Sequence, residues 1–215
     1  MTHAEGADLQ EYLDRLPLIA ILRGVEAHEA VAIGEVLVNA GFAIIEVPLN
    51  SPHACDSIRR LHAAFGHDVL LGAGTVMTAA QVHDVAEAGG ELIVMPHCDA
   101  TVIRAAVAAG LWCIPGIATP TEGFTALASG AHGLKLFPAE LLTPAVLRAL
   151  RAVFPADTRF FPVGGISPAS MGDYVDAGAA GFGLGSALYR RGDSPARVSA
   201  NANAFATAWS ALRRA

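Results

Sequence analysis

Lys135 is the only lysine in this chain of 215 residues, whose other thirteen basic side chains are all arginines. It lies inside the apolar segment 133–137, which reads GLKLF. Burial disfavours the charged ammonium and lowers the pKa, so a lysine in such a place can act as a nucleophilic amine near neutral pH. Arginine cannot take this role, because its guanidinium stays protonated. The alternative is a structural lysine that extends its amine to solvent from a strand end.

A carboxylate occupies an equally apolar setting. Glu46 lies in segment 43–47, which reads AIIEV, and burying its charge is costly unless the group is paired, protonated or functional. Near a reactive amine, Glu46 is suited to general acid/base catalysis. The alternative is a buried salt bridge to an arginine such as Arg23.

Two further polar side chains follow apolar runs. Arg23 follows the run 18–22, where a guanidinium can hold a substrate carboxylate through two hydrogen bonds. Thr75 ends the turn 72–75, which reads GAGT and presents a hydroxyl. This turn is not a dinucleotide-binding fingerprint, because the third glycine is missing. We therefore expect both residues to bind substrate rather than a cofactor.

Glycine-rich turns follow the last two apolar runs of the chain. Gly164 and Gly165 stand in the first turn, and Gly185 and Ser186 stand in the second. Backbone N–H groups beside glycine can approach a phosphate closely, and (β/α)8 barrels often bind phosphate in the loops after strands seven and eight. Each turn alone is a weak signal, but the pair favours a phosphate site.

Metal chemistry is not expected. His97, Cys98 and Asp99 are consecutive, so neighbouring side chains of an extended segment point in opposite directions. No second pair of ligands stands at a spacing typical of metal sites. We expect neither a metal nor a cofactor, and no Ser-His-Asp arrangement can be argued.

Short apolar runs alternate with helix-length segments along almost the whole chain. This pattern predicts an α/β protein with a TIM (β/α)8 barrel rather than an open sheet, built as one domain over residues 1–215. An apolar stripe over residues 9–16 predicts an additional N-terminal helix that closes the barrel bottom. The predicted strands are 18–22, 43–47, 69–72, 92–95, 112–114, 133–137, 160–163 and 180–184.

Local signals support the helices between these strands. Thr78 and Gln81 form a capping-box pattern, Pro52 is suited to a first helical turn, and Ser194-Pro195 opens the last helix. Alternation along strands predicts that Lys135 and Glu46 face the barrel interior. Glycines stand where helix C-caps are expected before the next strand, at Gly41, Gly89, Gly110, Gly130 and Gly178.

Composition excludes several classes of protein. Hydrophobic residues make up 53% and charged residues 16%, which favours a large core over disorder. A net charge of −6 argues against nucleic-acid binding, which needs a basic face. The three cysteines form no CxxC pair and fit a reducing compartment. Segment 1–10 is polar and acidic, and no apolar run is long enough for a membrane span, so we expect a soluble cytoplasmic protein.

Taken together, these motifs resemble the aldolases of 2-keto-3-deoxy-6-phospho sugar acids, known as the KDPG/KDPGal aldolase family. The likeness runs in one register from about residue 16 to residue 190. The matching segments are 21–24 (ILRG), 45–52 (IEVPLNSP), 72–76 (GAGTV), 134–140 (LKLFPAE) and 161–165 (FPVGG).

The resemblance implies a metal-free class I aldolase that acts on a small phosphorylated keto acid and assembles as a homotrimer. Lys135 would form the Schiff base and Glu46 would be the general acid/base. The implied substrate contacts are Arg23 and Thr75 at the keto-acid end and Gly165, Gly185 and Ser186 at the phosphate, with Gly164, Val163 and Phe137 completing the expected set.

Two branches of this family differ in the C4 configuration of the substrate. The gluconate branch typically has an arginine in its second-strand motif and a threonine before the glycine pair. Here those positions hold Asn50 and Val163, which favours the galactonate-derived substrate, with the gluconate-derived one as the alternative. Segment 95–98 (MPHC) departs from the family pattern and leaves the contacts of that loop open.

Two readings from other classes compete with the aldolase. A phosphosugar isomerase or epimerase can share the same phosphate loops but would use paired acids or a metal, and loss of activity with a chelator would favour it. A non-catalytic barrel that binds phosphorylated ligands would leave Lys135 fully solvated.

Overall fold

The strands of the protein are short and pair only in parallel. A computed structural model describes residues 8–213, so most of the polar segment 1–10 lies outside the described residues. Each of the eight predicted strand runs overlaps a strand, although the second and third strands extend one and two residues beyond the predicted ends. One further short strand, β6, follows β5 across Pro115. The strands are β1 Leu18–Ile21, β2 Ile44–Pro48, β3 Leu70–Gly74, β4 Leu92–Val94, β5 Trp112–Ile114, β6 Gly116–Ile117, β7 Leu134–Leu136, β8 Phe160–Pro162 and β9 Phe182–Leu184.

These strands form two parallel sheets. Six strands pair in the order β5-β4-β3-β2-β1-β9, and three pair in the order β6-β7-β8. A parallel bridge between Val163 and Gly183 links the end of β8 to β9. The α/β class and the parallel pairing are thus as predicted.

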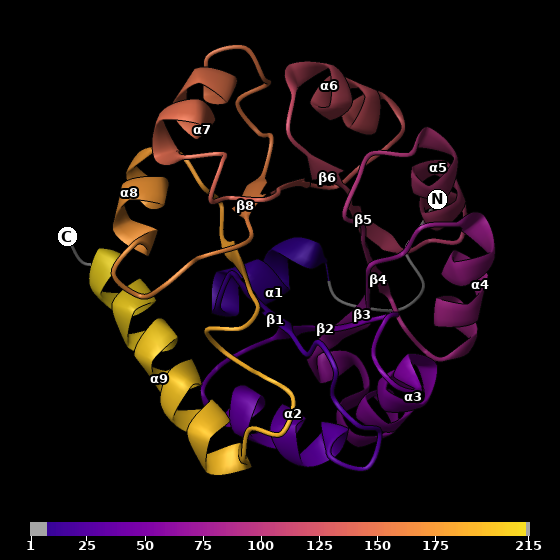
Figure 1. The fold of residues 1–215 in the computed structure, drawn as a ribbon. Coiled ribbons are helices and arrows are strands. Elements are labelled where there is room, and N and C mark those ends of the chain that lie inside the picture. Colours follow the sequence, from indigo (N-terminus) through magenta and orange to yellow (C-terminus); the bar gives the residue numbers. More distant parts are fainter. Residues whose placement is uncertain (1–7, 214–215) are drawn as a thin grey trace.

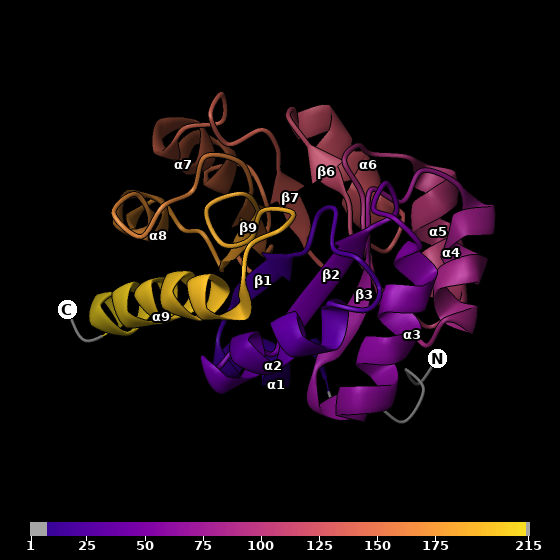
Figure 2. The same ribbon diagram turned by 60° about the horizontal axis from the view of Figure 1, so that its bottom comes forward.

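Helices surround the strands. Figure 1 shows α2 to α9 as a ring of helices, with the strands and α1 inside it. Figure 2 shows the long helix α9 beside α2, the two ends of this ring. The helices are α1 Leu9–Arg15, α2 Ala30–Asn39, α3 Ala54–Phe65, α4 Ala79–Glu87, α5 Ala100–Ala108, α6 Pro120–Ala128, α7 Pro144–Arg151, α8 Met171–Asp176 and α9 Pro195–Leu212, with a 3-10 turn over Gly66–Asp68.

The core has an inner and an outer layer because successive strand residues point to opposite faces. In β2, Ile44 belongs to the inner cluster, whereas Ile45 and Val47 pack outward against the helices. In β7, Leu134 and Leu136 are likewise in the outer layer. The predicted alternation is confirmed, and it leaves Glu46 and Lys135 on the inner face.

Helix α1 covers the amino-terminal ends of the strands. Its apolar residues Leu9, Tyr12 and Leu13 are buried in the inner cluster, as the stripe in the sequence predicted. The Tyr12 hydroxyl donates a 2.7 Å hydrogen bond to the carbonyl of His67. This end of the strand set is therefore filled by side chains.

Most of the helix-capping residues predicted from the sequence cap helices in the structure. Thr78 and Gln81 form the predicted capping box, and Pro195 follows its N-cap Ser194. The five glycines at predicted C-caps all have positive φ, which glycine adopts at little cost. The prediction for Pro52 was wrong: α3 begins at Ala54 after an N-cap at His53, whose φ is +47°, so the proline precedes the helix.

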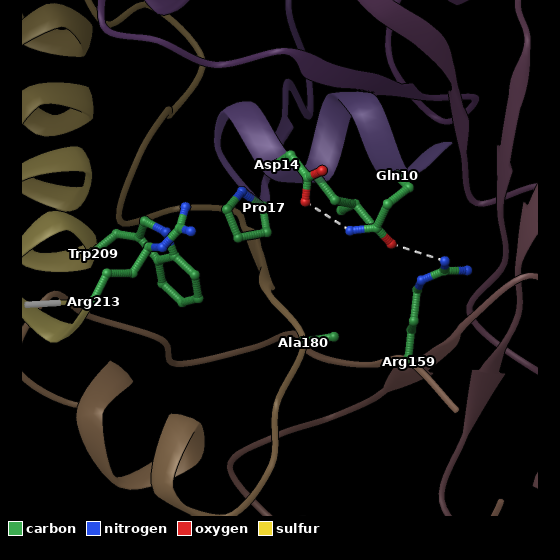
Figure 3. Close-up of a pocket in the computed structure, with 8 residues that line it drawn as sticks. Gln10, Asp14, Pro17, Arg159, Ala180, Trp209 and Arg213 are labelled. Atoms are coloured by element: carbon green, nitrogen blue, oxygen red, sulfur yellow. Dashed lines mark hydrogen bonds between the residues drawn. The ribbon is translucent and has the colours of Figure 1, made fainter. Parts of the chain in front are cut away.

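A cavity of about 370 Å³ opens at the amino-terminal end of the strands, between α1 and α9 (Figure 3). Arg159 Nη2 donates to Gln10 Oε1 over 2.9 Å, and Gln10 Nε2 donates to Asp14 Oδ1 over 2.8 Å. None of the residues expected to do chemistry lines this cavity. No helix within residues 8–213 is long and apolar enough to cross a membrane.

Candidate active site

A second cavity, of about 760 Å³, opens at the carboxyl ends of the strands. In parallel α/β folds this is the end where loops from several strands meet and active sites form. Nine of the residues predicted for catalysis or substrate binding, all except the buried Glu46, line it together with Gly183. They are Arg23, Thr75, Lys135, Phe137, Val163, Gly164, Gly165 and the pair Gly185 and Ser186.

Lys135 lies in the middle of β7 with its amine toward this cavity. Its backbone is fixed on both sides, in register with Gly116 of β6 and Phe161 of β8. The residue is only 5% exposed, and Nζ lies 4.7 Å from the centroid of the Phe137 ring. Burial lowers the pKa of Lys135, while the charge of Glu46 partly opposes this and Arg23 adds to it. A lowered pKa increases the neutral, nucleophilic fraction of the amine.

Glu46 lies in β2, next to Gly72 in the sheet register, and is 1% exposed. Burial raises the pKa of its carboxyl from 4.5 to about 7, although Lys135, Arg23 and the Gly74 N–H all favour the ionised form. Its Oε2 atom is buried and has no hydrogen-bond partner among the described residues. A carboxyl with this pKa exchanges a proton readily near neutral pH.

Gly74 makes room for this carboxyl. A Cβ atom at position 74 would overlap the Glu46 carboxylate oxygens, which lie directly against the Gly74 backbone. Any larger residue would force Glu46 to move. The glycine of the 72–75 turn therefore positions the acid, in addition to shaping the turn.

Arg23 is held at the cavity rim by a loop contact and not by Glu46. Its Nη1 donates a 2.7 Å hydrogen bond to Asn50 Oδ1, in the loop after β2. The next residue, Gly24, donates its N–H to Ser51 Oγ over 2.8 Å. Arg23 and Glu46 form no ion pair, so the buried salt bridge considered for Glu46 is wrong. Thr75, with a φ of +57°, also lines the opening, from the turn after β3.

The glycine turns after β8 and β9 lie side by side, and both line the cavity. Gly164 and Gly165 have φ of +110° and +63°, and the parallel bridge from Val163 to Gly183 brings the two turns together. No side chain fills the space beside Gly185, where a Cβ would meet nothing within 4 Å. Such turns can offer backbone N–H groups to an anion.

A known family model covers most of the chain. The family model described as "KDPG and KHG aldolase" matches residues 9–196. The chain belongs to the KDPG and KHG aldolase family. The resemblance drawn from the sequence motifs is thereby confirmed, as is the expectation of an enzyme of the lyase class.

The chain is similar in sequence to several aldolases, to different degrees. The chain is 46% identical over 199 residues to "2-dehydro-3-deoxy-6-phosphogalactonate aldolase" of Escherichia coli K12, covering 93% of this chain and 97% of that protein. It is 33% identical to the "KHG/KDPG aldolase" of the same strain, covering 74% of each. A solved structure described as "Native KDPGal structure" superposes with a TM-score of 0.92 at 46% identity, covering 94% of this chain and 98% of that one.

Several cavity residues of this aldolase-family chain were not predicted from the sequence. Glu140, Ser167, Tyr189 and Arg190 all line the opening. They stand in loops, where no periodicity marks them, and only their places after β7, β8 and β9 could have indicated them. Asp99, considered in the metal hypothesis, caps α5 by accepting the N–H groups of Thr101 and Val102. No group of three or more His, Cys, Asp or Glu within the described part of the chain is arranged as a metal site.

Proposed function

We propose that the protein is a class I aldolase that cleaves 2-dehydro-3-deoxy-6-phosphogalactonate to pyruvate and D-glyceraldehyde 3-phosphate. The observation that carries this function is the burial of both Lys135 and Glu46 beside one cavity. Burial lowers the pKa of the lysine and raises that of the carboxyl. A buried lysine with a lowered pKa is what Schiff-base formation needs. A carboxyl with a pKa of about 7 is suited to take up and release a proton in one cycle.

Lys135 begins the reaction. Its neutral Nζ adds to the C2 carbonyl of the substrate, and the resulting carbinolamine takes up one proton from solvent and loses water, which leaves an iminium ion joined to the enzyme. Arg23, at the rim, binds the adjacent C1 carboxylate, and Thr75 donates a hydrogen bond at the same end. The iminium then accepts the electron pair of the C3–C4 bond when that bond breaks.

Glu46 transfers the protons. As the ionised carboxylate it accepts the proton of the C4 hydroxyl, directly or through water, and the C4 carbon leaves as the aldehyde of glyceraldehyde 3-phosphate. The C3 carbon now belongs to an enamine, which takes the same proton back from Glu46. Water then hydrolyses the iminium and releases pyruvate, so that Lys135 and Glu46 return to their starting forms. Hydrolysis of this last iminium also returns to solvent the proton that the carbinolamine took up.

Trapping of the imine tests this mechanism. Pyruvate with sodium borohydride should add the mass of a reduced pyruvyl imine to the peptide that contains Lys135 and to no other. The chain offers a sharp control, because Lys135→Arg leaves no lysine side chain to be labelled. This variant should retain its circular dichroism spectrum and lose turnover by about 10⁴-fold or more. An unlabelled Lys135 peptide in active enzyme would contradict the proposal.

The choice of the galactonate-derived substrate is supported by two residues and by the relatives. Asn50 and Val163 occupy the positions at which the gluconate branch typically has arginine and threonine. The relatives at 46% and 45% identity are named as aldolase and probable aldolase of the galactonate-derived compound. The gluconate-derived compound is the second candidate, since relatives at 33–35% identity carry that name. Comparison of kcat/KM for the two C4 epimers distinguishes them.

We further propose that the two sheets close into one (β/α)8 barrel and that residues 1–215 form a single domain. Support comes from the Val163–Gly183 bridge on one side. On the other side, the N–H of His132 donates to the Cys113 carbonyl and that of Lys135 donates to the Pro115 carbonyl, so β5 and β6 act as one strand beside β7.

The family resemblance leads us to propose a homotrimer in the cytoplasm. The exposed rings and methyls of Phe124 and Val153 offer apolar surface for such an interface. The free thiols of Cys55, Cys98 and Cys113 suit a reducing compartment. Light scattering coupled to size exclusion measures the mass: about three times that of the chain is expected, and a monomer contradicts the trimer.

A further inference from the structure

Three basic side chains line the cavity, and two of them are already committed in the proposed mechanism. Lys135 reacts at C2 and Arg23 binds the carboxylate beside it, so Arg190 is the remaining cation. A phosphate monoester carries close to two negative charges near neutral pH. The glycine turns offer N–H dipoles to it but no full positive charge.

An acidic side chain makes this need greater. Glu140 also lines the cavity, and its side chain lies against the backbone of Gly164 and Gly165, close enough to obstruct a Cβ atom at either position. A phosphate bound over this turn would therefore meet a carboxylate. A facing cation is required to offset that repulsion.

Arg190 is fixed where such a cation is needed. Its Nε donates a 3.0 Å hydrogen bond to the carbonyl of Ser186, which belongs to the turn after β9. Its backbone N–H donates to Asp193 Oδ2 over 2.9 Å, and the N–H of Asp193 returns a bond to the Arg190 carbonyl. The side chain of Arg190 is therefore anchored on the proposed phosphate turn, and its backbone is held by Asp193.

The neighbouring arginine shows the contrast. Arg191 Nη2 pairs with Glu26 Oε1 at 2.5 Å, so its charge is neutralised outside the cavity. Neither terminal nitrogen of Arg190 has a hydrogen-bond or ion-pair partner among residues 8–213. The second carboxylate oxygen of Asp193 lies 3.4 Å from Arg197 Nε rather than beside the Arg190 guanidinium.

We propose that Arg190 binds the phosphate group of the substrate through its free terminal nitrogens and thereby sets the preference for phosphorylated keto acids. This inference rests on the proposed aldolase function and adds a specificity-determining residue to it. With Nε held on Ser186, the guanidinium keeps two donors for phosphate oxygens, a geometry that arginine provides and lysine does not.

The test compares two substrates in two variants. For Arg190→Gln, kcat/KM with 2-dehydro-3-deoxy-6-phosphogalactonate should fall about tenfold or more, mainly through KM, because a charge-assisted hydrogen bond is lost. With the unphosphorylated 2-dehydro-3-deoxygalactonate, kcat/KM should stay within about twofold of wild type. Arg191→Gln is the matched control: it removes the same charge one residue away and should leave the ratio of the two values unchanged.

Each other result has a definite meaning. An equal loss with both substrates would assign Arg190 a structural role in the loop and overturn the inference, as would an unchanged ratio. Inorganic phosphate provides a readout without turnover: it should raise the melting temperature of wild type and of Arg191→Gln, but not of Arg190→Gln. Wild-type protein that is stabilised by phosphate yet cleaves neither substrate would refute the proposed function while leaving Arg190 as a phosphate ligand.

Discussion

Asn50 and Arg23 are joined by a hydrogen bond of 2.7 Å, from Nη1 of the guanidinium to Oδ1 of the amide, between the loops after β2 and β1. Both side chains are exposed at the cavity rim, where an unsupported arginine would sample many rotamers. The bond reduces that freedom before substrate arrives. Asn50, one of the two residues by which the sequence favoured the galactonate-derived substrate, therefore also orients the proposed carboxylate-binding group.

The Asn50→Ala variant tests this orientation. Because Arg23 must then be ordered by the substrate itself, we expect KM to rise about three- to tenfold while kcat changes less than about twofold. Steady-state kinetics with the galactonate-derived substrate measures both values. Asn203→Ala, in the exposed face of α9, is the matched control and should behave as wild type. A fall in kcat with KM unchanged would exclude a positioning role.

The pH dependence of activity should follow Glu46. The reaction begins with this carboxyl ionised, and its pKa is raised to about 7, so kcat/KM should rise with pH through about 7. Glu46→Gln should lower kcat by about 10² to 10⁴-fold, the usual range for loss of a general acid/base. The comparison needs rates over a pH series for both proteins. A wild-type rate that falls through this range would contradict the assignment.

The free energy of unfolding should also depend on the ionisation of Glu46, but it should fall with rising pH where the activity rises. Its pKa is about 7 in the folded protein against 4.5 unfolded, so between these values the folded protein retains a proton that the unfolded chain has released. The free energy of unfolding therefore falls as pH rises through this window, and the penalty is absent below it.

Glu46→Gln removes that penalty. Relative to wild type, the variant should gain up to about 3 kcal/mol in the free energy of unfolding near pH 8, and the gain should vanish near pH 4.5. Urea denaturation at the two pH values measures it. Glu35→Gln, on the exposed side of α2, should show no such pH-dependent difference. A gain of equal size at both pH values would rule out an ionisation effect.

The residues on the inner faces of the strands were predictable from the sequence, but the loop residues were not. Strand alternation has a period of two, so the apolar runs around Lys135 and Glu46 determine which face each side chain takes. The Arg23–Asn50 bond joins two loops 27 residues apart, and no local pattern encodes such a contact. Arg190 stands six residues after the end of β9, beyond the reach of strand periodicity.

The bonding partner of Arg23 could not be predicted from the sequence either. From the sequence, Arg23 is a candidate salt-bridge partner for Glu46 because a buried acid is usually paired. In the structure, β1 ends at Ile21, so Arg23 lies in the loop beyond the strand and bonds to Asn50 instead. Whether a residue lies in a strand or in the loop beyond it depends on where strand pairing ends. Sequence patterns locate that point only within a residue or two.

Val163 offers a test of epimer preference. The side chain is buried and lines the cavity, while the backbone of Val163 bridges to Gly183, so we expect a hydroxyl introduced there to face the bound substrate. Val163→Thr should shift the ratio of kcat/KM for the galactonate and gluconate epimers about tenfold toward gluconate. Val163→Ala, which adds no hydroxyl, should lower both values with little change in their ratio. A Thr variant with the wild-type ratio would remove Val163 from the determinants of C4 configuration.

Gly74 provides the last prediction, because it separates the role of Glu46 from that of Lys135. A methyl group at position 74 overlaps the Glu46 carboxylate oxygens, so Gly74→Ala must displace the acid while leaving β7 untouched. A misplacement of about 1 Å can cost about 100-fold in rate, and we expect at least that loss in kcat. Borohydride trapping of pyruvate on Lys135 should persist, since imine formation needs the amine rather than the displaced acid. Gly172→Ala, in α8, is the matched control: its nearest neighbour is Leu212 Cδ2 at 3.3 Å, and full activity is expected. Loss of trapping together with turnover in Gly74→Ala would show that the two residues cannot be separated.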